Sequence, residues 1–252
     1  IYTDSTSIKG RGNASWNFPK KPYKLKLNNK VNLLGMPAKA KEWTLINNYG
    51  DKTLMRNMLA FNVSKMLNMP YTPAGNCVDV ILNGEYKGTY QLCDQIEVQK
   101  NRVNITEMEP TDITLPNLSG GYLLEIDAYA YNEISWFNST RGNPVTIHSP
   151  DDDKIVSQQT QYITNFFNTM EQEVYGRDFA NDNASFRKHL DTKTFLKNFL
   201  IGEFCGNTDT YWSTYMYKQR NNDTLYTGPI WDYDLAFEND NRTYPINNLT
   251  DF

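Results

Sequence analysis

Residues 77–96 read CVDVILNGEYKGTYQLCDQI, two strand-like arms joined by Asn83-Gly84. An Asn-Gly pair supplies the positive φ angles that tight hairpin turns require. The stretch therefore predicts an antiparallel hairpin. Cys77 and Cys93 lie near the outer ends of its arms, so a cross-strand disulfide is geometrically conceivable, but two buried thiols out of register are the favoured interpretation.

A helix and two strands are predicted before this hairpin. Residues 51–68, DKTLMRNMLAFNVSKMLN, place apolar side chains near helical spacing, with Asp51 as a cap and Met69-Pro70 as a stop. Residues 5–12 and 21–27 alternate as strands do. The first part of the chain therefore reads strand, strand, helix, strand, strand.

The remainder of the chain is predicted to hold further strands, two long helices and a late hairpin. The helices, at about 152–174 and 184–204, carry apolar residues at helical spacing and are predicted to face the core. The second does so through a set that includes Phe195, Phe199 and Phe204. The predicted strands are GGYLLEID (120–127), PVTIHSP (144–150), STYMYK (213–218) and TLYTGPIW (224–231).

This order predicts an α+β protein with the two-lobed layout of the protein-kinase-like fold. Residues 1–96 would form a small lobe, an antiparallel sheet plus one helix that binds nucleotide phosphates. Residues 97–252 would form a larger, mainly helical lobe with a catalytic β-hairpin and the metal site. Kinase-like helical lobes usually continue well past the metal acid, so we expect more chain beyond Phe252.

Composition limits the classes of partner. The 252 residues are 39% hydrophobic and carry 25 basic against 29 acidic side chains, a net charge of -4. No overall basic field argues for a nucleic acid polymer or an anionic membrane surface. No apolar run approaches the roughly 20 residues that cross a bilayer, so no membrane span is expected.

Two carboxylates stand close together in GPIWDYDLAF, residues 228–237. A strand would place Asp232 and Asp234 on one face, where they would repel unless something positive lay between them. Mg²⁺ takes carboxylate oxygens together with substrate phosphates, so a metal site is the favoured interpretation. Two exposed acids, or a pair held by an arginine, are the alternatives.

Three further sets of residues fit phosphoryl transfer, which needs a phosphate cradle, a cation and a residue that orients the attacking hydroxyl. Gly10, Arg11 and Gly12 could form the cradle, although a plain turn is the commoner meaning of Gly-x-Gly. Lys24 and Lys26 share one strand face and are candidate cations; the alternative is a solvated face.

The third set is a single loop acid, Asp209, in GEFCGNTDTYWSTYMYK. It lies between the predicted helix 184–204 and the late hairpin. A loop acid that precedes a hairpin ending in a metal acid is placed as a kinase catalytic aspartate would be.

The chain resembles the CotH family of spore-coat-protein-H-like atypical kinases. The resemblance rests on KGRGNASWNFPKKPYKLKL (9–27), KEWTLINNYGDKTLMRNMLAFNVSKML (41–67), NGEYKGTYQLCDQI (83–96), GGYLLEID (120–127) and GPIWDYDLAF (228–237). It implies an ATP-dependent, Mg²⁺-requiring protein kinase whose substrate is a coat or extracellular protein. It also implies a location in the spore coat, at the cell surface or outside the cell.

Carried over by position, Asp209 is similar to the catalytic acid, Asp232 to the metal acid and Asp234 to an auxiliary ligand. Lys24 or Lys26 would contact phosphate, and alternation does not choose between them. Two departures stand out. Helix 51–68 has no glutamate to pair with such a lysine, and Thr214 stands five residues after Asp209, where kinases commonly place a metal-binding Asn.

Three functions follow as hypotheses. The first is a secreted or surface kinase that phosphorylates Ser or Thr. The second is a pseudokinase that serves as a binding or assembly module, favoured by the two departures. The third is a glycoside hydrolase that uses two of the acids and the many aromatic side chains, but it leaves the lysine strand and the glycine loop without a role.

Overall fold

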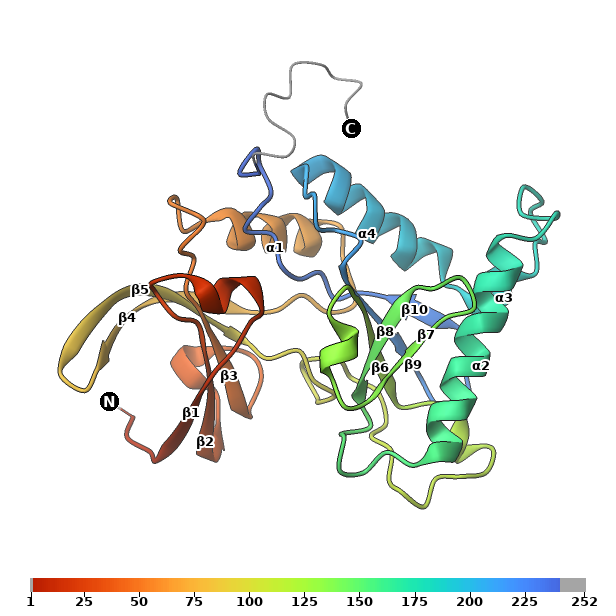
Figure 1. The fold of residues 1–252 in the computed structure, drawn as a ribbon, viewed down its shortest axis with the longest axis horizontal. Helices are drawn as coiled ribbons and strands as arrows, with labels where there is room; N and C mark the ends of the chain where they lie inside the picture. The colour runs from red at the N-terminus through yellow and green to blue at the C-terminus, as the bar shows by residue number, and fades with distance from the viewer. Residues whose placement is uncertain (1, 241–252) are drawn as a thin grey trace.

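The first half of the chain forms a five-stranded antiparallel sheet with strand order β1-β2-β3-β5-β4 (Figure 1). The structure is a computed structural model that describes residues 2–240. The strands are β1 (Thr6–Gly10), β2 (Tyr23–Val31), β3 (Ala40–Ile46), β4 (Gly75–Leu82) and β5 (Glu85–Asp94). The predicted hairpin is confirmed as β4 and β5, with positive φ at Asn83 and Gly84. Strand β3 was not predicted.

The register of this hairpin settles the cysteine question. Cys77 lies opposite Gln91, and Cys93 lies opposite Gly75. Cys77, Cys93 and Cys205 are all reduced. The out-of-register interpretation is therefore confirmed, but only Cys93 of the pair is buried, whereas Cys77 is exposed.

The predicted helices are present with shorter or divided bounds. The helix predicted for 51–68 is present as α1, which begins only at Arg56. The Asp51 carboxylate accepts a hydrogen bond from the backbone N–H of Arg56, 2.9 Å away. The prediction for 184–204 divides into α3 and α4 at Leu190. The helices are α1 (Arg56–Met66), α2 (Ser157–Val174), α3 (Phe186–His189) and α4 (Thr192–Cys205). Short 3-10 turns are η1 (Ala14–Asn17), η2 (Leu33–Gly35), η3 (Asn117–Ser119) and η4 (Ala130–Asn132).

A second five-stranded antiparallel sheet, with strand order β10-β9-β6-β8-β7, corrects the expectation that the rest of the chain is mainly helical. Its strands are β6 (Tyr122–Asp127), β7 (Trp136–Asn138), β8 (Pro144–Ser149), β9 (Ser213–Lys218) and β10 (Leu225–Thr227). The late hairpin, β9 and β10, is thus the edge of a sheet, because β9 also pairs with β6. An α+β class with two antiparallel sheets and four helices is what the structure supports.

Three apolar clusters hold these layers together. One covers a face of the first sheet around Trp43 and Tyr90. Another lies between the second sheet and α2, around Leu124, Ile147 and Phe167. The third joins α1, α4, β5 and β9 to the segment that follows β10. This third cluster fixes the parts of the molecule that carry the predicted acids.

Helix α4 turns its aromatic side chains outward. Its buried residues are Thr194, Asn198, Ile201, Gly202 and Cys205. By contrast, Phe195 is 44% exposed and Phe204 is 71% exposed, so the prediction that these residues face the core is wrong. Close approach explains the reversal, because a Cβ on Gly202 would lie 2.5 Å from the Thr210 side chain. Helices α1 and α4 lie side by side above the sheets (Figure 1).

Between residues 2 and 240, none of the helices has the length and apolar character needed to cross a bilayer.

Candidate functional site

The three predicted acids come from two loops that meet beside α1 and α4. Asp209 lies in the turn between α4 and β9, as predicted. Asp232 and Asp234 follow β10 but are not on a strand, and Asp232 has a left-handed φ of 64°. The strand premise for this pair is therefore wrong. The loop of Asp232 nevertheless contacts the turn that carries Asp209, through the Asn207 side chain, and the charge of Asp209 raises the pKa of Asp232.

The loop that carries Asp232 and Asp234 is held on both sides by hydrogen bonds to its backbone. Asn57 of α1 accepts a hydrogen bond from the Tyr233 N–H at 2.8 Å. The Asn207 side-chain amide donates to the Asp232 carbonyl at 3.2 Å. Arg56 donates to the Ala236 carbonyl at 2.9 Å. Helix α1 and the end of α4 thus set the position of a loop with no strand ladder of its own.

The carboxylates of this loop repel each other. Surrounding protein atoms and the charges of Asp234 and Asp209 raise the pKa of Asp232 to about 7, while Arg11 lowers it. Asp232 is exposed to solvent, so its contact with water reduces the desolvation that raises its pKa. The charges of Asp234 and Asp209 then account for more of the increase. Burial also raises the pKa of Asp234. A hydrogen bond with Asp232 lowers this pKa and so offsets part of the increase.

Arg11 is a cation whose charge acts on this acidic group, since it lowers the pKa of Asp232. Its guanidinium carbon lies 5.6 Å from the centre of the Trp231 ring, next to Asp232 in the chain. Its positive charge also lowers the pKa of Tyr215 in the second sheet, against the larger effect of burial. The loop between β1 and β2 therefore reaches the acids of the other half of the chain, as the phosphate-binding prediction requires.

The two glycines beside Arg11 have a structural explanation. A Cβ on Gly10 would lie 2.5 Å from the Trp16 ring. Gly12 has a φ of 81°, and a Cβ there would lie 2.1 Å from the Ser15 hydroxyl. Both contacts are within the turn, so the turn by itself accounts for both residues, and a phosphate cradle stays a prediction.

Lys24 and Lys26 lie together on β2 but are paired with an acid of the neighbouring strand. The Lys24 ammonium lies 2.5 Å from Glu42 on β3, and that of Lys26 lies 3.0 Å from it. Glu42 thus pairs with both lysines from the neighbouring strand. Lys24 is the less exposed of the two, with 36% of its side chain exposed against 62% for Lys26.

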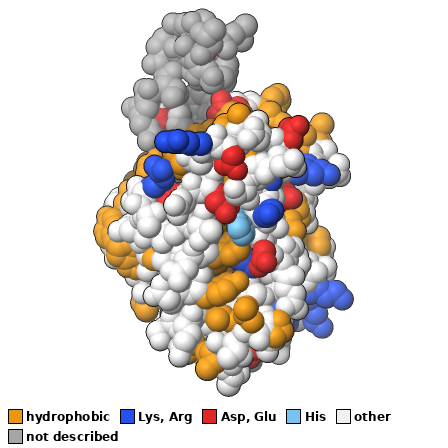
Figure 2. Space-filling view, turned by 90° about the vertical axis from the view of Figure 1, so that its right-hand side faces the viewer, with side chains coloured by type: hydrophobic (Ala, Val, Ile, Leu, Met, Phe, Trp, Pro, Cys, Tyr) orange, Lys and Arg blue, Asp and Glu red, His pale blue; other side chains and the backbone are white. Residues whose placement is uncertain are grey.

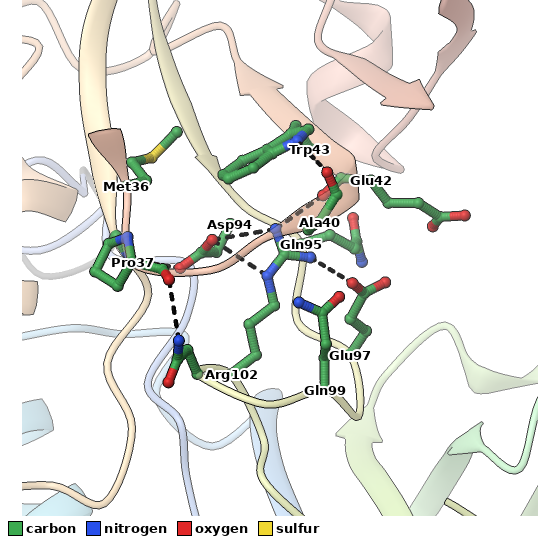
Figure 3. A network of polar contacts seen from close by, with 12 residues as sticks. Met36, Pro37, Ala40, Glu42, Trp43, Asp94, Gln95, Glu97, Gln99 and Arg102 are labelled. Atoms are coloured by element: carbon green, nitrogen blue, oxygen red, sulfur yellow. Dashed lines mark hydrogen bonds and ion pairs between the residues drawn. The ribbon is translucent and has the colours of Figure 1, made fainter. Parts of the chain in front are cut away.

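Arg102 fixes the strand that carries Glu42 (Figure 3). Its side chain is fully buried and pairs with Asp94 at the end of β5, 3.1 Å away, and with Glu97, 2.6 Å away. It also donates to the Glu42 carbonyl at 2.9 Å. Arg102 thereby ties β3 and β5 to the segment that leads into the second half of the chain.

A cavity of about 560 Å³ borders the same network, lined in part by Tyr71, Asp94 and Arg102. None of the predicted site residues lines it. We therefore base the candidate site on the acids and Arg11 and not on this cavity.

The second sheet adds polar residues that the sequence analysis did not select. Glu125 on β6 lies 2.6 Å from His148 on β8 through Oε2 and Nε2. Burial disfavours the charged imidazole, but the Glu125 carboxylate raises the pKa of His148 overall. Glu125 also contributes to the raised pKa of Asp232. The alternation in YLLEID places Glu125 on the face of the strand opposite to that of the apolar Leu124. This pattern is a signal by which the sequence could have indicated Glu125.

Thr214 hydrogen-bonds within the protein at the position where an amide ligand was expected. Its hydroxyl donates to the Thr210 carbonyl at 2.6 Å. The departure from the kinase pattern at this position is therefore real in structure as well as in sequence.

A divalent cation fits this donor set only together with ligands from another molecule. In the part of the chain that the structure describes, no three His, Cys, Asp or Glu side chains converge as a ready metal cage. Mg²⁺ is typically held by one or two carboxylates plus substrate phosphates, and Asp232 and Asp234 meet that requirement. The acids therefore suit a metal that arrives with a phosphorylated ligand.

The surface on the side of α2 and α3 mixes acidic, basic and apolar side chains without a continuous basic area (Figure 2). This distribution agrees with the net charge of -4. This face gives no support to nucleic acid binding.

Comparisons with known proteins identify one family. A family model described as CotH kinase protein matches residues 8–251, nearly the whole chain and all the residues of the predicted site. No curated protein matches the chain.

Proposed function

The chain belongs to the CotH kinase protein family, and on that premise we propose that it is an atypical protein kinase. It transfers the γ-phosphoryl group of ATP to a Ser or Thr hydroxyl of a coat or extracellular protein, with Mg²⁺. The observation that carries this proposal is that three separate segments meet: Arg11 lies over Trp231, next to Asp232, and Asn207, near Asp209, donates to the Asp232 carbonyl. Phosphoryl transfer depends on positioning and charge stabilisation, which such a group can supply.

Each residue has a defined role. Asp232 and Asp234 would hold Mg²⁺ through carboxylate oxygens. When bound, Mg²⁺ supplies charge neutralisation between the phosphates and the acids. Asp209 accepts a hydrogen bond from the acceptor hydroxyl and orients it for attack. Arg11 binds phosphate oxygens from the β1–β2 loop, since its planar group suits bidentate contacts.

Lys24 has a supporting role in this scheme. Its pairing with Glu42, at 2.5 Å, holds its ammonium on the face of β2 and β3. A lysine held in this way can add a second positive charge for the phosphates. Lys26 is more exposed and is the weaker candidate.

The architecture is compatible with two kinase-like lobes. Under this proposal, the first sheet with α1 is the nucleotide-binding lobe, and the second sheet with α2 to α4 is the catalytic lobe. The chain would act outside the cell, at the cell surface or in the spore coat, a location that rests on the family resemblance.

A second candidate, a pseudokinase that serves as an assembly module, is favoured by Thr214 itself, because a hydroxyl stands where a kinase commonly places a metal-binding Asn. The two candidates differ in turnover but not in fold.

A thermal-shift titration with ATP and Mg²⁺ tests binding first. We expect an increase in Tm that is lost in Asp232→Ala, because a ligand that binds only the folded state stabilises it. No shift with any nucleotide would exclude both the kinase and a nucleotide-binding pseudokinase.

Transfer of labelled phosphate from ATP then separates the two candidates. For the kinase, Asp209→Asn should still bind MgATP while transfer falls by about 10²-fold or more, because general-base groups contribute on that order. Nucleotide binding without transfer in the unmodified protein would favour the pseudokinase.

A further inference from the structure

Asn207 has one buried oxygen without a partner, next to the acidic group. The residue is 7% exposed and follows Gly206, which ends α4. Its backbone N–H donates to Gly202, its backbone carbonyl accepts from Thr210, and its side-chain NH₂ donates to the Asp232 carbonyl. Within residues 2–240, its side-chain oxygen Oδ1 meets no hydrogen-bond donor.

Such an oxygen requires an explanation. A buried acceptor left unsatisfied costs about 1–3 kcal/mol. Rotating the amide by half a turn would not remove the cost, because Oδ1 would then face the Asp232 carbonyl, another acceptor. The orientation of the amide is therefore set by Asp232, and Oδ1 remains available to an external partner.

The surroundings favour a cation as that partner. The side-chain NH₂ of Asn207 contacts Asp232, and Asp209 lies two residues further along the same turn. Asp234 lies two residues after Asp232, so the two segments that Asn207 joins carry three acidic side chains. A hard divalent cation takes carboxylate and amide oxygens, so it would satisfy the orphaned oxygen in a surrounding of acidic side chains.

We propose that Oδ1 of Asn207 is a ligand of the divalent cation held by Asp232 and Asp234. The inference rests on the proposed function, because it concerns the same metal. Kinases commonly supply an amide oxygen to the metal from an Asn five residues after the catalytic acid, and this chain has Thr214 there. We infer that Asn207 supplies the amide oxygen instead. Here the amide lies two residues before Asp209.

Binding of Mn²⁺ in the presence of a non-hydrolysable ATP analogue tests the inference without reference to turnover. Electron paramagnetic resonance gives the free Mn²⁺ concentration and hence the Kd. We expect Asn207→Ala to raise the Kd by about tenfold or more, as losses around metal sites do. Circular dichroism of each variant reports whether it is folded.

Two further variants distinguish a metal-ligand role of Asn207 from a bracket role, in which its side chain only holds the Asp232 loop in place. Asn207→Asp keeps an oxygen but loses the donor to Asp232, so a ligand role predicts Mn²⁺ affinity at least as high as in the unmodified protein. A bracket role predicts the same loss as Asn207→Ala. The matched control, Asn57→Ala, removes the hydrogen bond to Tyr233 on the other side of the loop. An equal loss of affinity in Asn57→Ala and Asn207→Ala would overturn the inference.

The outcomes also separate this inference from the proposed function. Mn²⁺ binding that is unchanged in Asn207→Ala overturns the ligand role alone. No binding of Mn²⁺ with the ATP analogue by the unmodified protein overturns both. Manganese density about 2.1 Å from Oδ1 in a crystal of the complex, close to the Mg²⁺–oxygen distance, would support the inference directly.

Discussion

The guanidinium of Arg11 lies over the indole ring of Trp231, 5.6 Å from its centre, although the two residues belong to opposite ends of the described chain. A cation over an aromatic face is attracted by the ring quadrupole. The contact holds the β1–β2 loop against the segment that carries Asp232. A nucleotide held by the acids would therefore meet Arg11 without a large rearrangement of this loop.

Removal of the Arg11 charge should weaken nucleotide binding more than removal of an exposed lysine. We expect Arg11→Met to raise the Kd for MgATP by about tenfold or more, since a charge-assisted hydrogen bond contributes about 1.5–3 kcal/mol. Lys26→Met is the matched control, because Lys26 is exposed and paired with Glu42. Isothermal titration calorimetry measures both. Equal losses in the two variants would contradict the role given to Arg11.

Asp232 should make the metal-free protein less stable as pH rises. Its pKa is raised to about 7 when folded, so the folded state binds this proton more tightly than the unfolded state. Stability from this group is therefore present below pH about 4 and is lost as pH rises toward 7.

The substitution Asp232→Asn removes that dependence. We expect its Tm to exceed that of the unmodified protein by about 2–4 °C at pH 8, or about 1 kcal/mol after allowance for solvent screening. At pH about 3, where this carboxyl is protonated in both the folded and the unfolded state, the two should melt together. A lower Tm for Asp232→Asn at pH 8 would mean that the carboxylate stabilises the fold.

The buried ion pair between Arg102 and Asp94 should be costly to break. Arg102→Met leaves the Asp94 carboxylate, 1% exposed, without its partner. We expect a loss of about 3 kcal/mol and a fall in Tm of about 10 °C, because an unpaired buried charge is strongly unfavourable. Adding Asp94→Asn to Arg102→Met should recover part of the lost stability, because it removes the unpaired buried charge. Lys87→Met, at the exposed pair with Glu85, is the control and should change stability by less than about 1 kcal/mol.

Because α4 exposes aromatic side chains, we expect replacement of one of them, Phe204, to have little effect on the free energy of unfolding. Phe204 is 71% exposed, whereas Phe61 on α1 is 1% exposed. Phe204→Ser should change the free energy of unfolding by about 0.5 kcal/mol or less, and Phe61→Ala should lower it by about 3–5 kcal/mol. Urea unfolding followed by circular dichroism measures both. A comparable loss in Phe204→Ser would show that this side chain is covered in solution.

Local chemistry made several features predictable from the sequence. Asn83-Gly84 predicted the β4–β5 hairpin, because only a few residues adopt its turn geometry. The apolar spacing before Met69-Pro70 predicted α1, and the matched segments predicted the family. The candidate acids were also found in this way, since short motifs keep Asp209, Asp232 and Asp234 in recognisable surroundings.

The tertiary structure decided what depends on partners far away in the chain. Periodicity predicted β6, β8 and β9 as strands but not that they share one sheet, because pairing partners leave no local signal. It also predicted the wrong face of α4 for burial, since close packing against Thr210 requires small residues there.

The conformation of Asp232 and the pairing of Lys24 with Glu42 were likewise beyond the sequence. The first is held by side chains of other segments, such as Asn207, and the second by the register of β2 against β3. The sequence by itself thus determined most of the local elements and the family, and it supplied the candidate acids. Only the tertiary structure decided which charges meet, because Arg11 and the acids become neighbours through long-range packing and not through spacing along the chain.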